Sequence, residues 1–217
     1  MGVVDSDRAS QSEPLVGCGG VVLCGGESRR MGRSKAWLPF GEEALLQRVV
    51  RTLQECLSPI VVVAQAEQSL PTLPAEVLRT HDEHPGRGPL EGLRVGLGGI
   101  AGKAEVAFVT SCDVPLLQAA FVRAMLDRLG EHQVVVPVDD RFHHPLAAVY
   151  RTSVHAEIEA LLQADQRRPI ALFDRVSTLR IPVEELRDVD PALDSLRNVN
   201  LPEDYEAALR AAGFADQ

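Results

Sequence analysis

The sequence lacks the features that mark a membrane protein, a secreted protein or a nucleic-acid-binding protein. No apolar run approaches the roughly 18 residues that span a membrane, and the polar N-terminus has no signal-peptide pattern. Basic residues are in the minority, with 22 Lys and Arg against 31 Asp and Glu and a formal net charge of −9. Because phosphate backbones recruit basic faces, we expect no nucleic acid as a main partner. These absences favour a cytoplasmic protein with no membrane partner.

Cysteine is scarce as well. The four cysteines are Cys18, Cys24, Cys56 and Cys112, and no two of them are separated by only two residues. Scattered single thiols suit a reducing compartment better than a disulfide framework or a zinc site. We therefore expect buried free thiols.

Short apolar runs alternate with amphipathic helical patterns over most of the chain. The alternation predicts βαβ units, and hence a Rossmann-like three-layer α/β/α fold with a mostly parallel sheet covered on both faces. Its 217 residues suit one domain, so we expect a disordered tail over residues 1–16 and a single domain over 17–217. The expected strands are 20–24, 60–63, 105–110, 134–136, 145–150 and 178–183, and the expected helices are 45–57, 115–129, 153–164 and 202–212.

Ligands of such sheets bind beyond the carboxyl ends of the strands. The loops after Leu23, Val63 and Val109 are therefore candidates for the functional site. Asp113 follows the third of these strands, where it could bind Mg²⁺ carried by a nucleotide. Its alternative role is to cap the helix that we expect from Pro115.

The loop after the first strand combines glycine with positive charge. Gly25 and Gly26 permit close approach of backbone N–H groups to an anion, and four basic residues lie within positions 29–35. The alternative is a mobile turn with a solvated basic face. Gly32 is followed by Arg33, which does not fit a Walker A loop, and Gly17 and Gly19 precede the strand, which does not fit a dinucleotide fingerprint. The pattern argues against a P-loop kinase and a nicotinamide enzyme.

Five segments of the chain form a series of motifs: residues 23–35, Asp82 with residues 88–93, residues 112–115, residues 144–146 and residues 198–204. In this order they resemble the signature motifs of the molybdenum cofactor guanylyltransferases and their nucleotidyltransferase relatives. The resemblance runs at intervals from residue 20 to residue 208.

This resemblance implies a GT-A-like nucleotidyltransferase that transfers GMP from GTP to the phosphate of molybdopterin. The reaction depends on Mg²⁺, releases pyrophosphate and forms molybdopterin guanine dinucleotide. By the same resemblance, Arg30, Lys35 and Asp113 are catalytic, and Asp113 binds the metal. The nucleotide contacts Leu23, Cys24, Gly25, Gly26, Lys35, Asp82 and Asp113, and the substrate also contacts Asn198 and Asn200.

Several of these residues could instead have ordinary structural roles. Asn198 and Asn200 could serve turns and caps, and Asn200 with Glu203 resembles a capping box. The histidines at 81, 84, 143 and 144 are expected to be packing or loop residues, although 81–84 could be read as a metal cluster. No covalent nucleophile is needed, because the acceptor phosphate is already ionised at neutral pH.

Three positions depart from the family pattern. Cys24 replaces the usual Ala, Leu201 replaces the usual Thr, and Ala64 stands where relatives often carry Asn for a nucleotide contact. The last change leaves a cytidylyltransferase of the same cofactor, or a transferase for another phosphorylated acceptor, as alternatives. A non-catalytic nucleotide-binding module is the alternative from a different class. We expect a monomer or a weak oligomer.

Overall fold

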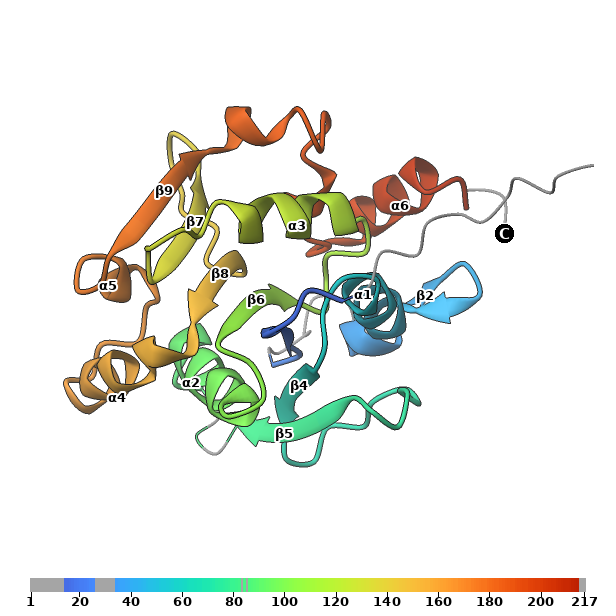
Figure 1. Cartoon of the computed structure of the whole chain (residues 1–217). Helices are drawn as coiled ribbons and strands as arrows, with labels where there is room; N and C mark the ends of the chain where they lie inside the picture. Colours follow the sequence, from blue (N-terminus) through green and yellow to red (C-terminus); the bar gives the residue numbers. More distant parts are fainter. Residues whose placement is uncertain (1–13, 26–33, 83, 85, 215–217) are drawn as a thin grey trace, which may run out of the picture.

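The protein is described here by a computed structural model that covers residues 14–25, 34–82, 84 and 86–214. Its centre is a seven-stranded sheet in the order β5-β4-β1-β6-β8-β7-β9 (Figure 1). The strands are β1 (Cys18–Leu23), β4 (Ile60–Gln65), β5 (Leu78–Asp82), β6 (Val106–Ser111), β7 (Val134–Val138), β8 (Ala147–Arg151) and β9 (Thr178–Pro182).

The sheet is mostly parallel, as predicted. β1 pairs in parallel with β4 and β6, and the β4–β5 and β7–β9 pairs are also parallel. Only β8 is antiparallel to its neighbours in this sheet. The chain leaves β1 toward β4 on one side and later returns to β6 on the other, so the strand order reverses at β1.

Helices cover both faces of the sheet, which confirms the predicted three layers. Alternate residues of each strand point to opposite faces. Val22 and Val62 pack with α1 (Leu45–Gln54) and α3 (Ala119–Asp127) in one core. Val21 and Val61 pack with α2 (Pro89–Ile100), α4 (His155–Gln163) and α5 (Ile170–Phe173) in the other. Figure 1 shows these two groups of helices on either side of the strands.

A third, smaller core joins the remaining elements. Phe40 and Leu45 pack with Val199 and Ala208, and the ring of Phe214 meets that of Phe40 edge-on at 5.3 Å. The core ties the last helix to the hairpin near the first loop. The core contains residues of β2 (Pro39–Phe40), α1 and α6 (Pro202–Ala211). The 3₁₀ turn Lys35–Trp37 precedes the hairpin, whose second strand is β3 (Glu43–Ala44), and further 3₁₀ turns are Thr152–Val154, Val183–Leu186 and Asp194–Leu196.

The prediction lacks β5 and α2, as well as the short elements β2, β3 and α5. β5 is an edge strand with alternating partial exposure, so its sequence carries no apolar run. α2 contains several glycines, which are poor helix formers. A Cβ at Gly96 would lie 2.3 Å from Cγ1 of Val21, so glycine is what allows α2 to approach β1 this closely.

Helix boundaries also differ from the prediction. The third helix begins at Ala119 rather than Pro115, and α1 ends at Gln54, before Leu57. Leu57 is nevertheless fully buried, because the chain turns back into the same core before β4. The apolar spacing therefore predicts the buried face of each helix correctly. It predicts the ends of the helices less accurately.

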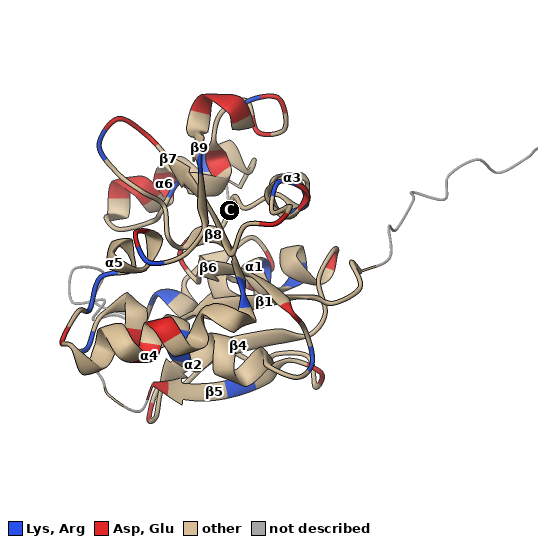
Figure 2. Cartoon of the chain, turned by 60° about the vertical axis from the view of Figure 1, so that its left-hand side comes forward, with Lys and Arg blue, Asp and Glu red and all other residues tan. Residues whose placement is uncertain are grey.

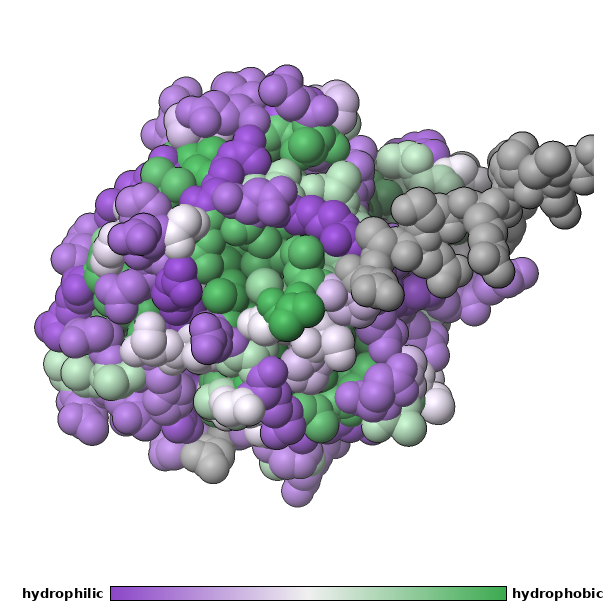
Figure 3. Space-filling view, in the orientation of Figure 1, coloured by the Kyte–Doolittle hydropathy of each residue, from purple (hydrophilic) through white to green (hydrophobic). Residues whose placement is uncertain are grey.

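The surface agrees with an acidic protein. Figure 2 shows Asp and Glu gathered on α4 and α6, with Lys and Arg dispersed. Figure 3 shows an apolar area in the middle of one face, framed by polar residues. None of the described helices has the length and hydropathy needed to cross a membrane.

Candidate functional site

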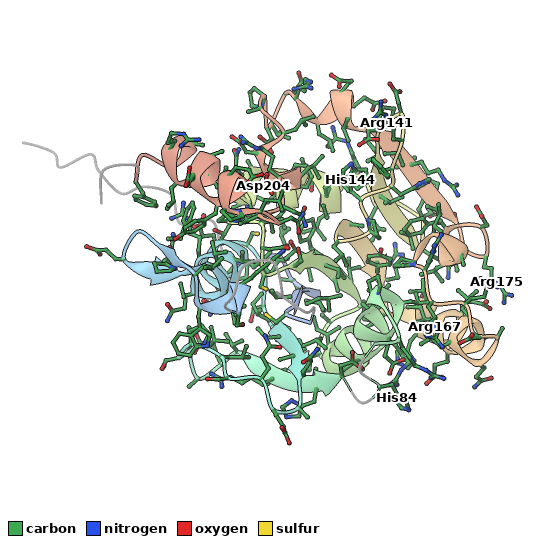
Figure 4. All side chains as sticks on the ribbon, turned by 180° about the vertical axis from the view of Figure 1, so that it is seen from behind. His84, Arg141, His144, Arg167, Arg175 and Asp204 are labelled. Carbon is green, nitrogen blue, oxygen red and sulfur yellow. The ribbon has the colours of Figure 1, made fainter. Side chains whose placement is uncertain are left out.

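A cavity of about 530 Å³ opens at the carboxyl ends of the central strands. The three loops predicted from the sequence all contribute to it, through Gly25, Gln65 and Asp113. In Figure 4, His144 and Asp204 are labelled in the upper half of the view and His84 in the lower half. Its lining consists of Leu23, Gly25, Val63, Ala64, Gln65, Asp82, Gly86, Gly88, Pro89, Gly92, Ser111, Asp113, Leu146 and Asn198.

The Asp113 carboxylate is held by three side chains. Its Oδ2 accepts a hydrogen bond from Nζ of Lys35 at 2.8 Å, and the two groups form an ion pair. Its Oδ1 accepts hydrogen bonds from Oγ of Ser111 and, at 3.1 Å, from Nδ2 of Asn198. The alternative that Asp113 caps a helix is wrong, because α3 begins at Ala119 with Gln118 in the capping position.

Lys35 joins Asp113 to the last loop. Nζ of Lys35 also donates to Oδ1 of Asn200 at 2.8 Å. The backbone N–H of Val199 donates to the carbonyl of Asp113 at 2.8 Å, which fixes the 198–200 segment against the end of β6. The structure thus brings together four residues that were predicted separately: Lys35, Asp113, Asn198 and Asn200.

The predicted capping box at the start of α6 is wrong in its partners. Asp204, not Glu203, caps this end: its Oδ2 accepts from the backbone N–H groups of Asn200 and Leu201 at 3.0 and 2.8 Å. Because α6 begins at Pro202, Asp204 is its third residue, the position from which a carboxylate can reach back. The side chain of Asn200 is left to contact Lys35.

The glycine turn borders a second, smaller cavity. Cys24, Gly25 and Lys35 line this space of about 100 Å³ together with Asp113. Nε2 of Gln68 donates to the carbonyl of Cys24 at 3.1 Å and so fixes the backbone just before Gly25. Gly26 and Arg30 lie outside the described residues, and their predicted roles stay predictions.

Asp82 and Gln65 form the far wall of the main cavity. They are neighbours in the β4–β5 register, at the carboxyl ends of the two strands. Oδ1 of Asp82 accepts from the backbone N–H of His84 at 2.9 Å. Ala64, buried beside Gln65, also lines the cavity.

Sequence reasoning missed Ser111, Gln65 and Gln68. Ser111 stands two positions before Asp113, and strand alternation puts positions i and i+2 on one side, which was the available signal. Gln65 needed β5 to be recognised, because its role follows from its pairing with Asp82. Nothing in the local sequence marks Gln68.

Three of the four histidines have structural partners, whereas His81 is an exposed residue of β5 and not a loop residue. His84 lies 3.5 Å from Glu91, and His144 lies 3.0 Å from Asp139. The ring of His143 stacks on Phe173 at 5.6 Å. Among the described residues, no group of three His, Cys, Asp or Glu side chains could hold a metal.

The thiols are free, and Cys24, Cys56 and Cys112 are buried. The Cys24 thiol donates a hydrogen bond to Cys112, and this bond together with burial raises the pKa of Cys24 well above its ordinary value. Burial raises the pKa of Cys56 to about 11. Protonated thiols are poor nucleophiles, which agrees with the expectation that no cysteine acts covalently.

Known proteins resemble the chain along most of its length. A family model described as MobA-like NTP transferase domain matches residues 20–178. A Mycobacterium tuberculosis H37Rv protein named "probable molybdenum cofactor guanylyltransferase" is 42% identical over 187 residues, covering 84% of this chain and 90% of the relative. A Mycobacterium marinum protein of the same name is 38% identical over 207 residues, covering 93% and 98%. The fold matches molybdopterin-guanine dinucleotide biosynthesis protein A from Archaeoglobus fulgidus with a TM-score of 0.72 at 24% identity, covering 89% and 98%.

Proposed function

This chain is a nucleotidyltransferase that belongs to the MobA-like NTP transferases, and from that membership we propose that it transfers GMP from GTP to the phosphate of molybdopterin. The proposed reaction uses Mg²⁺, releases pyrophosphate and forms molybdopterin guanine dinucleotide. The observation that carries the proposal is the Lys35–Asp113 pair, set where the glycine turn meets the cavity.

The residues present suit a magnesium ion that arrives with a nucleotide. Mg²⁺ prefers six oxygen ligands and commonly takes one or two carboxylates, with phosphates and water completing the set. Asp113 supplies one carboxylate at the strand end, and the described residues add no acidic cluster that would hold a resident ion. When bound, Mg²⁺ would neutralise charge on the reacting phosphates.

The other proposed roles follow from the charge and position of each group. Backbone N–H groups at Gly25 and Gly26 bind phosphate oxygens, and Lys35 and Arg30 neutralise phosphate charge. Asn198 lines the main cavity and contacts the substrate beside Asp113. Holding both substrates in line contributes most of the remaining acceleration.

The wall formed by Asp82 and Gln65 favours guanine over cytosine. An ionised carboxylate only accepts hydrogen bonds. Guanine offers two adjacent donors on its Watson–Crick edge, whereas cytosine offers one amino group. Gln65 supplies, from the neighbouring position, an amide of the kind that Ala64 lacks. We therefore place the base against this wall and keep the cytidylyltransferase as the second candidate.

The test is pyrophosphate release by the purified chain with Mg²⁺ and molybdopterin, comparing GTP with CTP and identifying the dinucleotide by mass spectrometry. We expect release with GTP and little with CTP. Preference for CTP would overturn the proposed base, and no release with either nucleotide would overturn the proposed activity.

A matched pair of variants locates the base. Asp82→Asn should lower the ratio of GTP to CTP turnover, because the amide offers a donor to a base edge that presents donors. Asp188→Asn, at an exposed position after β9, removes the same charge far from the cavity and should leave the ratio unchanged.

A further inference from the structure

The two oxygens of Asp113 are occupied by different kinds of partner. Ser111 and Asn198 are neutral donors, and both bind Oδ1. Oδ2 instead binds the ammonium of Lys35 at 2.8 Å. Oδ1 is therefore anchored to the protein frame, while Oδ2 carries a cation at the end of a flexible side chain.

This ammonium is paired with Oδ2, the oxygen through which Asp113 would hold a metal. The side chains of Lys35 and Asp113 are only 17% and 13% exposed, so water screens their attraction little. The oxygen of Asn200 accepts a second hydrogen bond from the same ammonium and holds it over Oδ2. A divalent ion arriving alone must therefore displace Lys35 from its ion pair.

A nucleotide changes this balance, because its phosphates offer Lys35 several charged acceptors. We propose that Lys35 is an exchangeable counter-ion of Asp113, that Asn200 positions it there, and that Lys35 leaves Oδ2 for the phosphates when a nucleotide binds. Asp113 then binds metal through Oδ2 tightly only in the presence of a nucleotide. The inference rests on the proposed function insofar as the natural ligand is a metal–triphosphate complex.

The first experiment measures Mn²⁺ binding to the nucleotide-free protein by electron paramagnetic resonance. Lys35→Met should bind Mn²⁺ about tenfold more tightly than the unaltered protein, because the competing charge is gone. Lys103→Met is the matched control: Lys103 is the chain's other lysine, it is exposed, and its removal should change nothing. Lys35→Gln, also uncharged, serves if the Met variant fails to fold.

A double-variant cycle places the effect at Asp113. Adding Asp113→Asn to Lys35→Met should abolish the tighter binding. Asn200→Ala should raise Mn²⁺ affinity less than Lys35→Met does, and should have no effect once Lys35 is Met. A purely structural role for Asn200 would not vanish in that background.

The second experiment follows Lys35 directly. In protein labelled with ¹³C-lysine, two side-chain signals are expected, and Lys103→Arg assigns them. GTP added without metal should shift the Lys35 signal, and CTP is tested in parallel in case the base preference is wrong.

The outcomes separate this inference from the proposed function. Equal Mn²⁺ affinity in the unaltered protein and the Lys35 variants overturns the inference, whatever the transfer activity. A Lys35 signal unmoved by a bound nucleotide does the same. Tighter Mn²⁺ binding in the variants without any guanylyl transfer supports the inference and removes only the proposed function.

Discussion

Asp113 and Lys35 lie 78 residues apart in the chain and meet in a partly shielded ion pair. The charge of the Asp113 carboxylate can be removed without removing the oxygen that accepts its hydrogen bonds. An Asn at position 113 keeps an oxygen to accept from Ser111 and Asn198, but it loses the charge that attracts a cation. The carboxylate can therefore be tested without removing the hydrogen bonds around it.

We expect Asp113→Asn to lower the turnover of guanylyl transfer by about 10²–10³-fold, the usual cost of removing one charge-stabilising group. The free energy of unfolding should change by no more than about 2 kcal/mol, since the neighbouring hydrogen bonds persist. Pyrophosphate release and urea unfolding measure the two effects. Asp127→Asn, exposed at the end of α3, is the control, and turnover of the Asp113 variant equal to that of the control would refute the assignment.

For single residues, the sequence predicts which side chains reach the site but not which of them contact one another. Asp113 was predictable because it follows an apolar strand whose carboxyl end faces the ligand edge. The bond between Lys35 and Asn200 joins positions 165 residues apart, and it depends on how the last loop docks on β6. No local pattern records that docking, so the contact between Asn200 and Lys35 could not be predicted.

At the scale of elements, α2 shows how a weak helix former can be required by packing. Its glycines lower the helix propensity, so the apolar spacing of the sequence does not predict this helix. The same glycines allow α2 to contact β1 and β4. Gly92 faces Leu23 and Gly99 faces Val61, both at 3.2 Å from an added Cβ. The sequence does not predict β5 for a different reason: an edge strand buries too few side chains to need an apolar run.

Gly96→Ala tests this packing. The new Cβ would lie 2.3 Å from Val21, so the helix or the strand must shift, and we expect a loss of about 1–3 kcal/mol in the free energy of unfolding. Gly98→Ala is the matched control on the same helix. Gly98 is exposed, and its Cβ would meet only the ring of His155 at 3.3 Å.

Because alanine favours a helix by up to about 1 kcal/mol over glycine, Gly98→Ala should be neutral or stabilising. Urea unfolding of the two variants gives the comparison. Equal stability changes would mean that propensity, and not the approach of α2 to the sheet, decides the outcome.

At the scale of the whole molecule, the cavity is built by segments from across the chain. Residues from Leu23 to Asn198 line it, so a ligand there would contact segments from both the early and the late part of the chain. Binding to the native state alone stabilises that state, by about 2.7 kcal/mol when the ligand is at one hundred times its Kd. A ligand held by such distant segments should stabilise the whole fold.

We expect GTP with Mg²⁺, at that excess, to raise the Tm by about 5–10 °C. Differential scanning calorimetry measures the shift. Mg²⁺ alone should give a much smaller one, and the Asp113→Asn variant should lose most of the increase. An equal shift with Mg²⁺ alone would contradict the assignment of the metal to a nucleotide-dependent site.

The reversed direction of β8 has a consequence for how the cavity is built. Since β8 runs against β6 and β7, the connection between β7 and β8 returns to the edge where β1, β4 and β6 end, and it brings Leu146 to the cavity. One wall is thus encoded before Asp113 and the facing wall after it. Asn198 also follows Asp113 in the chain and donates to its Oδ1, so a hydrogen bond ties the later wall to the earlier one and the two cannot change independently.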